Sequence, residues 1–262
     1  MIMKITIDYT KSAQENADYF YKRSKKLAMK RAGAEASIIN LEKRLGAAKV
    51  VTESTQKKRI KVTEKEWYQK FHWFYTSDGL LVIAGRDAQQ NELLNSKYFE
   101  GNDLFFHANI FGAAVTILKE GIKAGKEARE EAAQFAACYS SAWKDGLPAV
   151  DVYAMRRNQV SKSASKGSLS SGSFLLSGER EWYKNTGLSL VLFIKDERLN
   201  ATPEACFYRL KEAGKVPDTY VLVKQGKMKK SDAAKKISKS LEFPDIDTIM
   251  QQLPAGEFRT AK

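Results

Sequence analysis

The first quarter of the chain carries a helical repeat of apolar positions. Between residues 11 and 49 apolar side chains recur at alternating steps of three and four, the spacing of a coiled-coil seam. The seam positions are Ala17, Phe20, Ser24, Leu27, Arg31, Ala34, Ile38, Leu41 and Leu45. Polar residues at two of these positions, Ser24 and Arg31, weaken the seam. The pattern predicts one long helix, which either packs on its own domain or forms an arm that pairs with another helix.

Two further features mark the ends of this region. Residues 1–8 (MIMKITID) alternate apolar and polar side chains, which predicts a short strand, and Thr10 or Ser12 can cap the helix that follows. After residue 49 the pattern breaks into the basic and polar run VTESTQKKRIKVTE. We therefore predict a strand, helical arm and connector over residues 1–57 and a globular domain over residues 58–262.

The second region mixes strand and helix patterns. HWFYTSDGLLVIAG predicts a β-hairpin, because aromatic and β-branched residues flank an Asp-Gly turn. Helices are predicted at AQQNELLNSKYF, KEAREEAAQFAACYSSAW, SDAAKKISKSL, which Ser231 would cap, and DIDTIMQQL; strands are predicted at DLFFHANI, near 151–156, 173–177 and 188–194, and finally at TYVLVK. Regular βαβ alternation is missing. We expect an α+β fold with a mixed, largely antiparallel sheet and flanking helices.

Charge adds a class of partner to this picture. Forty-four Lys and Arg against 31 Asp and Glu give a formal net charge of +13, which favours polyanionic partners such as nucleic acid. Cys138 and Cys206 stand far apart, outside any Cys-x-x-Cys or His-rich run, so we expect no metal site. The N-terminus does not resemble a signal peptide, and no stretch approaches the roughly 20 apolar residues that span a bilayer. We expect a cytoplasmic protein without membrane contact.

Catalytic signatures are weak. The sequence has two histidines, His72 and His107, and it has no Gly-x-Ser-x-Gly elbow, P-loop or dinucleotide fingerprint. His107 with Asp87 and Glu92 is the one arrangement that suggests hydrolysis. A single histidine at a strand end is more often a hydrogen-bonding residue than a general base. We expect a protein that is not an enzyme and that uses no cofactor.

Three groups of residues have the chemistry of phosphate binding. In the first, Arg86 and Asp87 follow the strand LLVIAG, and Gln90 and Asn91 open a helix beside them, so a guanidinium, amides and backbone donors come together. The alternative is that Arg86 and Asp87 pair with each other or with the end of the sheet. The second group is a loop rich in hydroxyl, amide and cationic donors, and the third is a lysine cluster before a helix. Their members are Arg156, Arg157, Gln159, Ser161, Lys162 and Lys166 in the loop, and Lys227, Lys229 and Lys230 in the cluster. The alternatives are an ordinary surface loop and a solvated charge run.

A dense aromatic group precedes the hairpin turn. Trp67, Phe71, Trp73, Phe74 and Tyr75 can stack on bases, but their alternating spacing is more typical of core packing. Core packing is also expected for Trp143. Trp182 and Tyr183 lie beside basic residues, Lys184 among them, and are expected to be exposed.

Several of these motifs together resemble the NFACT-R domain, the RNA-binding module of ribosome quality-control proteins. The resemblance rests on EWYQKF, GRDAQQNE, FFHANIFGA with Lys119 downstream, CYSSAW, NQVSKSASKGSLSSGSF, KKSDAAKKI and LPAGEF, in the order of the family. The N-terminal helix is similar to the coiled-coil segment that precedes this domain. The resemblance implies contacts with tRNA and the large ribosomal subunit, and it adds His107 and Lys119 to the candidate RNA-binding residues. Lys184, beside Trp182 and Tyr183, is a further candidate.

The chain departs from the family pattern in ways that affect these expectations. Asn109 stands where the family usually has Asp, and His72 and Ser141 stand where Arg is common. The large NFACT-N domain has no counterpart in these residues, so we expect no tail synthesis by this chain alone. The leading interpretation is an RNA-binding protein of ribosome quality control. The alternatives are a subunit that pairs through its N-terminal helix with a separate NFACT-N-type protein, and a factor associated with tRNA modification.

Overall fold

The computed structural model describes residues 6–52, 66–162 and 172–261 and divides the chain into two compact units, Met1–Lys61 and Val62–Lys262. The predicted boundary after residue 57 lies outside the described residues. Each unit is considered by itself. Among the described residues, no helix is both long enough and apolar enough to cross a bilayer.

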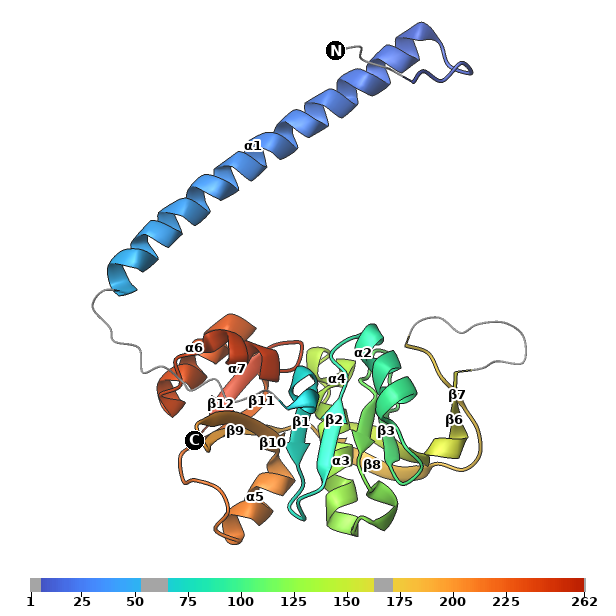
Figure 1. The fold of residues 1–262 in the computed structure, drawn as a ribbon, viewed down its shortest axis with the longest axis vertical. Coiled ribbons are helices and arrows are strands. Elements are labelled where there is room, and N and C mark those ends of the chain that lie inside the picture. Colours follow the sequence, from blue (N-terminus) through green and yellow to red (C-terminus); the bar gives the residue numbers. More distant parts are fainter. Residues whose placement is uncertain (1–5, 53–65, 163–171, 262) are drawn as a thin grey trace. The chain divides into compact units, whose positions relative to one another are not determined.

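The first unit consists mainly of α1 (Ala13–Thr52) (Figure 1). The predicted cap at Ser12 is confirmed, because the Glu15 backbone N–H donates to Ser12 Oγ at 3.2 Å and the Ser12 N–H donates to Glu15 Oε2 at 2.8 Å. Residues 6–8 are not in a strand, and the rest of that predicted strand lies outside the described residues. Leu27, Ile38 and Leu41 of the predicted seam are each more than half exposed.

A six-stranded antiparallel sheet forms the centre of the second unit, in the order β1-β2-β4-β3-β5-β8. Its strands are β1 (His72–Tyr75), β2 (Leu81–Ala84), β4 (Thr116–Leu118), β3 (Leu104–Ala108), β5 (Ala149–Arg156) and β8 (Glu181–Gly187). The predicted hairpin is confirmed by the antiparallel register from His72 opposite Ala84 to Tyr75 opposite Leu81. In its turn Gly79 has φ +87°, a conformation that glycine adopts without strain.

A second antiparallel sheet has the order β10-β9-β11-β12 and contains β9 (Leu190–Lys195), β10 (Arg198–Pro203), β11 (Tyr220–Met228) and β12 (Phe258–Ala261). A small ribbon pairs β6 (Val160–Ser161) with β7 (Leu175–Leu176). The prediction that TYVLVK is the final strand was wrong, because β12 follows it and pairs with it. β12 has no recognisable strand pattern in the sequence, because it buries only one side chain, Phe258, and is stabilised by its pairing with β11.

Helices cover these sheets. They are α2 (Ala88–Leu93), a π-helical turn η2 (Leu94–Tyr98), α3 (Lys126–Cys138), α4 (Ser141–Lys144), α5 (Glu204–Glu212), α6 (Lys230–Leu241) and α7 (Ile246–Gln252), with 3-10 turns η1 (Trp67–Lys70), η3 (Gly121–Lys123) and η4 (Arg157–Gln159). The predicted single run ending in CYSSAW is two helices, because Ser140 leaves the helical conformation and its Oγ caps α4. The predicted Ser231 cap was wrong: α6 begins at Lys230 after Lys229, which makes no side-chain cap.

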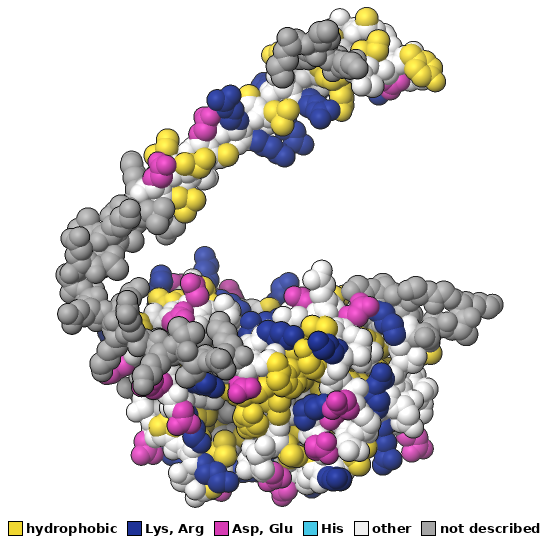
Figure 2. Space-filling view, viewed as in Figure 1, with side chains coloured by type: hydrophobic (Ala, Val, Ile, Leu, Met, Phe, Trp, Pro, Cys, Tyr) yellow, Lys and Arg dark blue, Asp and Glu magenta, His cyan; other side chains and the backbone are white. Residues whose placement is uncertain are grey.

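Both faces of the six-stranded sheet are buried. Val82 and Phe106 point into a core that includes the alanine-rich face of α3, while Ile83 and Phe105 point into a second core closed by Leu94 and Phe99. Alternate strand residues thus belong to opposite cores, as the two-residue period of a strand requires. With both faces covered, the ends of the strands and the loops that leave them are the places available to a ligand. In Figure 2, exposed hydrophobic side chains gather in the middle of the visible face, with Lys and Arg around them.

Candidate nucleic-acid interface

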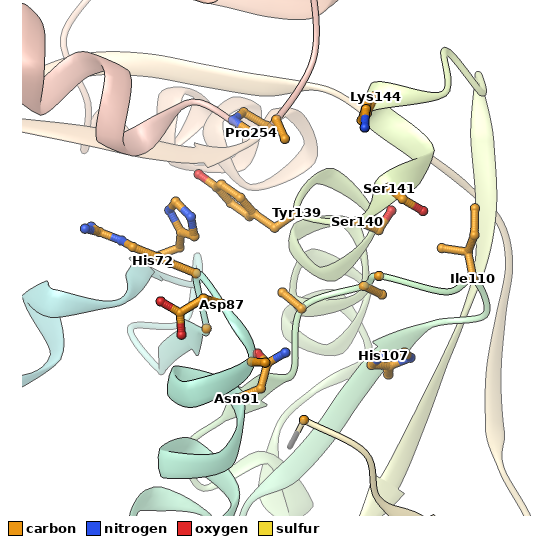
Figure 3. A pocket seen from close by; sticks show the side chains of 18 of the residues that line it. His72, Asp87, Asn91, His107, Ile110, Tyr139, Ser140, Ser141, Lys144 and Pro254 are labelled. Carbon is orange, nitrogen blue, oxygen red and sulfur yellow. The ribbon is translucent and has the colours of Figure 1, made fainter. Parts of the chain in front are cut away.

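An open cleft of about 1210 Å³ lies where the loop after β2, the turn between β3 and β4, α4 and residues 253–255 come together (Figure 3). Arg86, His107, Lys144 and Lys230 all line it. The β2 and β3 strands supply two of its walls through their carboxyl-terminal ends, so the sheet register fixes where these side chains stand. The volume is enough for a small organic group or a nucleotide.

Three basic side chains cluster in this cleft. Burial lowers the pKa values of the Arg86 guanidinium and the Lys230 ammonium, and the charge of Arg86 lowers that of Lys230 further. Burial also lowers the pKa of His72 well below its usual value, with the positive charges of Arg86 and Lys230 adding to the effect. Two cations held close together in a partly buried site raise the free energy of the empty cleft, and a bound anion would relieve that repulsion.

No carboxylate forms an ion pair with the cations of this cleft within the described part of the chain. Neither Arg86, Lys144 nor Lys230 has a carboxylate oxygen within 4.0 Å there, although Asp87 and Asp247 also line the cleft. The charges of these three cations are therefore available to a phosphate group.

Backbone carbonyls position the two half-buried cations. Arg86 Nη2 donates to the Phe71 carbonyl oxygen at 3.1 Å, and Lys230 Nζ donates to the Leu253 carbonyl oxygen at 2.8 Å. Each bond uses one donor of a group that has several. Within the described residues the buried Arg86 Nε and His72 Nδ1 atoms have no hydrogen-bond partner. The side chains are thus fixed in place with hydrogen-bonding capacity to spare.

The neighbours of Arg86 shape the loop on which it stands. Asp87 does not pair with Arg86 in this region; it caps α2, accepting the Gln90 N–H on Oδ1 at 2.8 Å. Gln90 Oε1 accepts the Arg86 N–H at 3.1 Å, and Asn91 Oδ1 accepts the Val115 N–H at 3.0 Å. Gly85 allows this arrangement, since a β-carbon there would collide with Asn91. Of the four residues predicted in this group, Arg86 carries the positive charge, and Asp87, Gln90 and Asn91 hold the backbone around it.

His107 lines the same cleft from β3. Burial lowers its pKa, and its Nδ1 lies 3.3 Å from the Tyr153 hydroxyl oxygen. The carboxylates considered for a hydrolytic cluster are engaged elsewhere: Asp87 caps α2, and Glu92 forms an ion pair with Lys162 at 3.3 Å. Within the described residues, no group of three His, Cys, Asp or Glu side chains could hold a metal ion.

Several cleft residues were not singled out by sequence reasoning. Tyr139 stacks on His72 with ring centroids 3.9 Å apart, and its hydroxyl donates to the Gln252 carbonyl oxygen at 2.6 Å. Lys144 ends α4, and Phe111 projects from the β3–β4 turn with 98% of its surface exposed. The family resemblance could have pointed to this cleft. The two positions where the family commonly has Arg, His72 and Ser141, both line it.

The predicted loop begins away from the cleft. Arg156 and Gln159 line a separate hollow, with Gln159 Oε1 accepting the Arg156 N–H at 2.8 Å. Arg157 lies 5.1 Å from the Phe99 ring centroid and donates to the Val160 carbonyl oxygen at 2.9 Å. Ser161 is in β6. Lys166 lies outside the described residues.

The far end of the loop returns to the cleft. Ser173 and Phe174 line it, and Lys162 Nζ lies 5.5 Å from the Phe174 ring centroid. One end of the predicted loop therefore reaches the same site as Arg86.

The remaining candidates are scattered. Lys184 pairs with Asp151 at 2.8 Å and lies 4.1 Å from the centroid of Trp182. Trp182 is exposed as predicted, but Tyr183 is partly buried against the core, so the prediction of exposure was wrong for Tyr183. Lys119 is bonded to Asp103 and Glu100. Lys227 and Lys229 are exposed at the end of β11 and before α6. Arg86, Asp87, Asn91, His107 and Lys230 are the predicted residues that the cleft brings together.

Of the aromatic group, Phe71 and Phe74 are buried as predicted, and so is Trp143. Trp67 and Tyr75 are 44% and 42% exposed, so the prediction of core packing was wrong for these two. Trp67 stacks on the ring of Tyr98 with centroids 4.6 Å apart, which partly shields it.

Residues 70–178 match the family model described as the NFACT protein RNA binding domain. That stretch contains the loop after β2, the β3–β4 turn and α4, which form most of the cleft. The chain therefore belongs to the NFACT-R family of RNA-binding domains.

Named relatives agree with this assignment. The chain is 36% identical over 208 residues to the archaeal Rqc2 homolog aRqcH of Methanocaldococcus jannaschii, which covers 76% of this chain and 30% of the relative. It is 33% identical over 205 residues to the ribosome quality control complex subunit NEMF homolog of Drosophila melanogaster, covering 73% of this chain and 20% of that protein. The chain thus spans less than a third of the length of these relatives.

A solved structure gives a weaker likeness. The C-terminal part of the fibronectin/fibrinogen-binding protein from Streptococcus suis aligns with 53% of this chain and 50% of its own, at a TM-score of 0.40 and 20% identity. A likeness at that level carries no argument about fold or function.

Proposed function

We propose that this chain binds RNA of the translation machinery, tRNA or large-subunit ribosomal RNA, during quality control of stalled nascent chains, and that the cleft at Arg86 is its main phosphate contact. The observation that carries the proposal is the pair of cations Arg86 and Lys230, whose charges repel each other beside the neutral His72 ring in the empty site. The net charge of +13 would also attract a polyanion such as RNA by long-range electrostatic attraction, and the phosphates of RNA are the anions that would enter the cleft. The relatives named for ribosome quality control give the cellular setting, which we place in the cytoplasm.

The role we propose is binding without catalysis. His107 is half-buried, and its recorded hydrogen-bonding partners are the Tyr153 hydroxyl and the backbone of Ala108 and Ala113 rather than a carboxylate. A general base is usually oriented by a third group that stabilises its protonated form, and Tyr153 supplies no such charge. An RNA-modifying activity lost on His107→Ala in a folded protein would overturn this part of the proposal.

Salt-dependent binding to two RNAs tests the proposal. Affinities of the full chain for a labelled tRNA and for isolated large ribosomal subunits are measured over a series of salt concentrations. Because each phosphate contact releases counterions, the logarithm of the affinity should fall linearly with the logarithm of salt concentration. The RNA that is bound with the higher affinity is identified as the partner. Binding no stronger than that of a neutral control protein, for both RNAs, would contradict the proposal.

A second function is favoured by the exposed seam of α1. Leu27, Ile38 and Leu41 are apolar, exposed and spaced as in a coiled coil, which is the pattern of a helix that pairs with another chain. Under this alternative the arm captures a separate NFACT-N-type protein. Pull-down of such a protein by the full chain, and its loss on removal of residues 1–50, would support it.

A further inference from the structure

The turn between β3 and β4 presents an aromatic ring to solvent at the edge of the cleft. Phe111 is 98% exposed, although its neighbours Ala113 and Ala114 are buried. A phenyl ring left entirely in water forgoes the free energy of burial that most of the other phenylalanines here gain. Such a residue is a candidate contact for a ligand rather than a packing residue.

The backbone that carries this ring is held from both sides. Ser141 Oγ of α4 donates to the Phe111 carbonyl oxygen at 2.7 Å, and the Ala114 N–H donates to the Tyr139 carbonyl oxygen at 3.1 Å. Gly112 has φ +79°, which lets the chain reverse immediately after the ring. The ring is therefore presented on a fixed support, and little conformational entropy of the backbone would be lost when it binds.

Cations stand within the same cleft. Lys144 lies one helical turn beyond Ser141 on α4, and Arg86 and Lys230 also line the cleft. Apolar side chains such as Ile110 and Met250 line it as well. The cleft thus combines a flat aromatic surface, an apolar lining and positive charge.

We infer that the cleft takes an unpaired nucleotide of RNA, with its base stacked on Phe111 and its phosphate held by Arg86, Lys230 and Lys144. This inference rests on the proposed RNA-binding function and makes it more specific, since a double helix keeps its bases stacked inside and offers none to Phe111. Every base has an aromatic face, so stacking is tolerant of sequence. The site then selects RNA loops and single-stranded ends over duplexes.

The alternative for an exposed phenyl ring is insertion into an apolar pocket of another protein. Shape distinguishes the two cases, because a leucine fills an apolar pocket almost as well as phenylalanine but offers no flat face to a base. Phe111→Trp keeps the aromatic face, Phe111→Leu keeps the apolar volume, and Phe111→Ala removes both. All three variants are expected to fold, since the side chain is exposed.

The test measures binding of the full chain and these variants to two probes. One is a short single-stranded oligoribonucleotide without self-complementarity, and the other is the blunt duplex of that strand with its complement. Tyr208→Ala, which removes an exposed aromatic of α5 outside the cleft, is the matched control.

The wild-type chain should bind the single strand more tightly than the duplex. Phe111→Ala and Phe111→Leu should each weaken single-strand binding about 10-fold, within the range for loss of one stacking partner, and leave duplex binding unchanged. Phe111→Trp and Tyr208→Ala should retain wild-type affinity. Wild-type affinity in Phe111→Leu, or a preference for the duplex, would overturn the inference while leaving RNA binding intact. Failure of the wild-type chain to bind either probe, tRNA or large subunits would overturn the proposed function itself.

Discussion

Lys119 Nζ and Asp103 Oδ2 form an ion pair of 2.6 Å in which the aspartate side chain is fully buried. Lys119 also bonds Glu100 at 2.6 Å and the Tyr98 carbonyl oxygen at 3.0 Å. Burial opposes the charge of Lys119, but its hydrogen bonds to Asp103 and Glu100 outweigh that effect and raise its pKa. Lys119 therefore closes a network that ties η2 to the β3 and β4 strands. Its proposed contact with RNA stays a prediction, and its structural contribution can be tested separately.

Lys119→Met should lower the free energy of unfolding by roughly 2–4 kcal/mol, because it leaves the buried Asp103 carboxylate without its counter-charge. Urea unfolding followed by circular dichroism measures the change. Lys123→Met, an exposed lysine on η3, should be nearly neutral and serves as the control. Equal stability of the two variants would show that Asp103 does not depend on this ion pair.

His72 should make the domain less stable in mild acid. In the unfolded chain a histidine titrates near pH 6.5, whereas burial lowers the pKa of folded His72 well below that value. Below about pH 6.5 the unfolded chain then binds more protons than the folded chain, so the free energy of unfolding decreases as the pH is lowered. Above that pH the unprotonated His72 contributes its full share to the free energy of unfolding.

Substitution of the ring isolates this contribution. His72→Phe keeps a flat ring against Tyr139 but cannot take up a proton, so the free energy of unfolding should depend less steeply on pH between about 7 and 5. Urea unfolding at several pH values gives both slopes. His107, whose pKa is also lowered, contributes to the slope that remains. Identical slopes in wild type and variant would mean that folding does not lower the pKa of His72.

The two adjacent arginines at the start of the basic loop should behave differently. Arg156 is exposed, so Arg156→Glu should weaken RNA binding without changing stability. Arg157→Glu should weaken binding and also lower the free energy of unfolding by about 1 kcal/mol, because it loses the contact with Phe99 and the bond to the Val160 carbonyl oxygen. Filter binding and thermal melts give the two readouts. A large loss of stability in Arg156→Glu would assign that residue a structural role instead.

Removal of residues 1–50 separates the two proposed functions. Residues Val62–Lys262 form a compact unit, so the truncated chain should keep its thermal transition and most of its RNA affinity. Capture of a partner chain through α1 should disappear. Loss of most RNA affinity on truncation would move the main RNA contact from the cleft to the arm.

Local sequence patterns predicted those elements whose stability is local. The hairpin from His72 to Ala84 was readable from its strand residues and its Asp-Gly turn, and α1 from its cap and its repeat. Strand β12 was missed because pairing with β11 stabilises it rather than its own pattern. The burial of Glu131 in α3 could not be predicted from local sequence either. Its fully buried carboxylate accepts hydrogen bonds from Ser77 and Arg209, which are distant in the sequence.

The site was partly predictable for a related reason. Arg86 could be identified from the sequence because a strand, a turn and a helix meet there within a few residues. Lys144 and Phe111 could not, because their place in the cleft depends on how α4 packs beside the β3–β4 turn. Lys230 was identified for its charge, while its position beside Arg86 follows from the tertiary fold and its bond to the Leu253 carbonyl oxygen.

The most direct test of the cleft as the RNA site compares binding and stability in Arg86→Gln and Lys230→Gln. Each variant removes one of two cations that repel each other in the empty cleft and also a hydrogen bond to a backbone carbonyl, so these effects oppose each other and the free energy of unfolding should change by no more than about 1 kcal/mol. Each should weaken binding to tRNA or to large ribosomal subunits roughly 10-fold and reduce the salt slope by about one. Lys215→Gln, which removes an exposed lysine outside the cleft, is the control of equal charge. Wild-type affinity and salt slope in both cleft variants, or losses no larger than that of Lys215→Gln, would contradict the account.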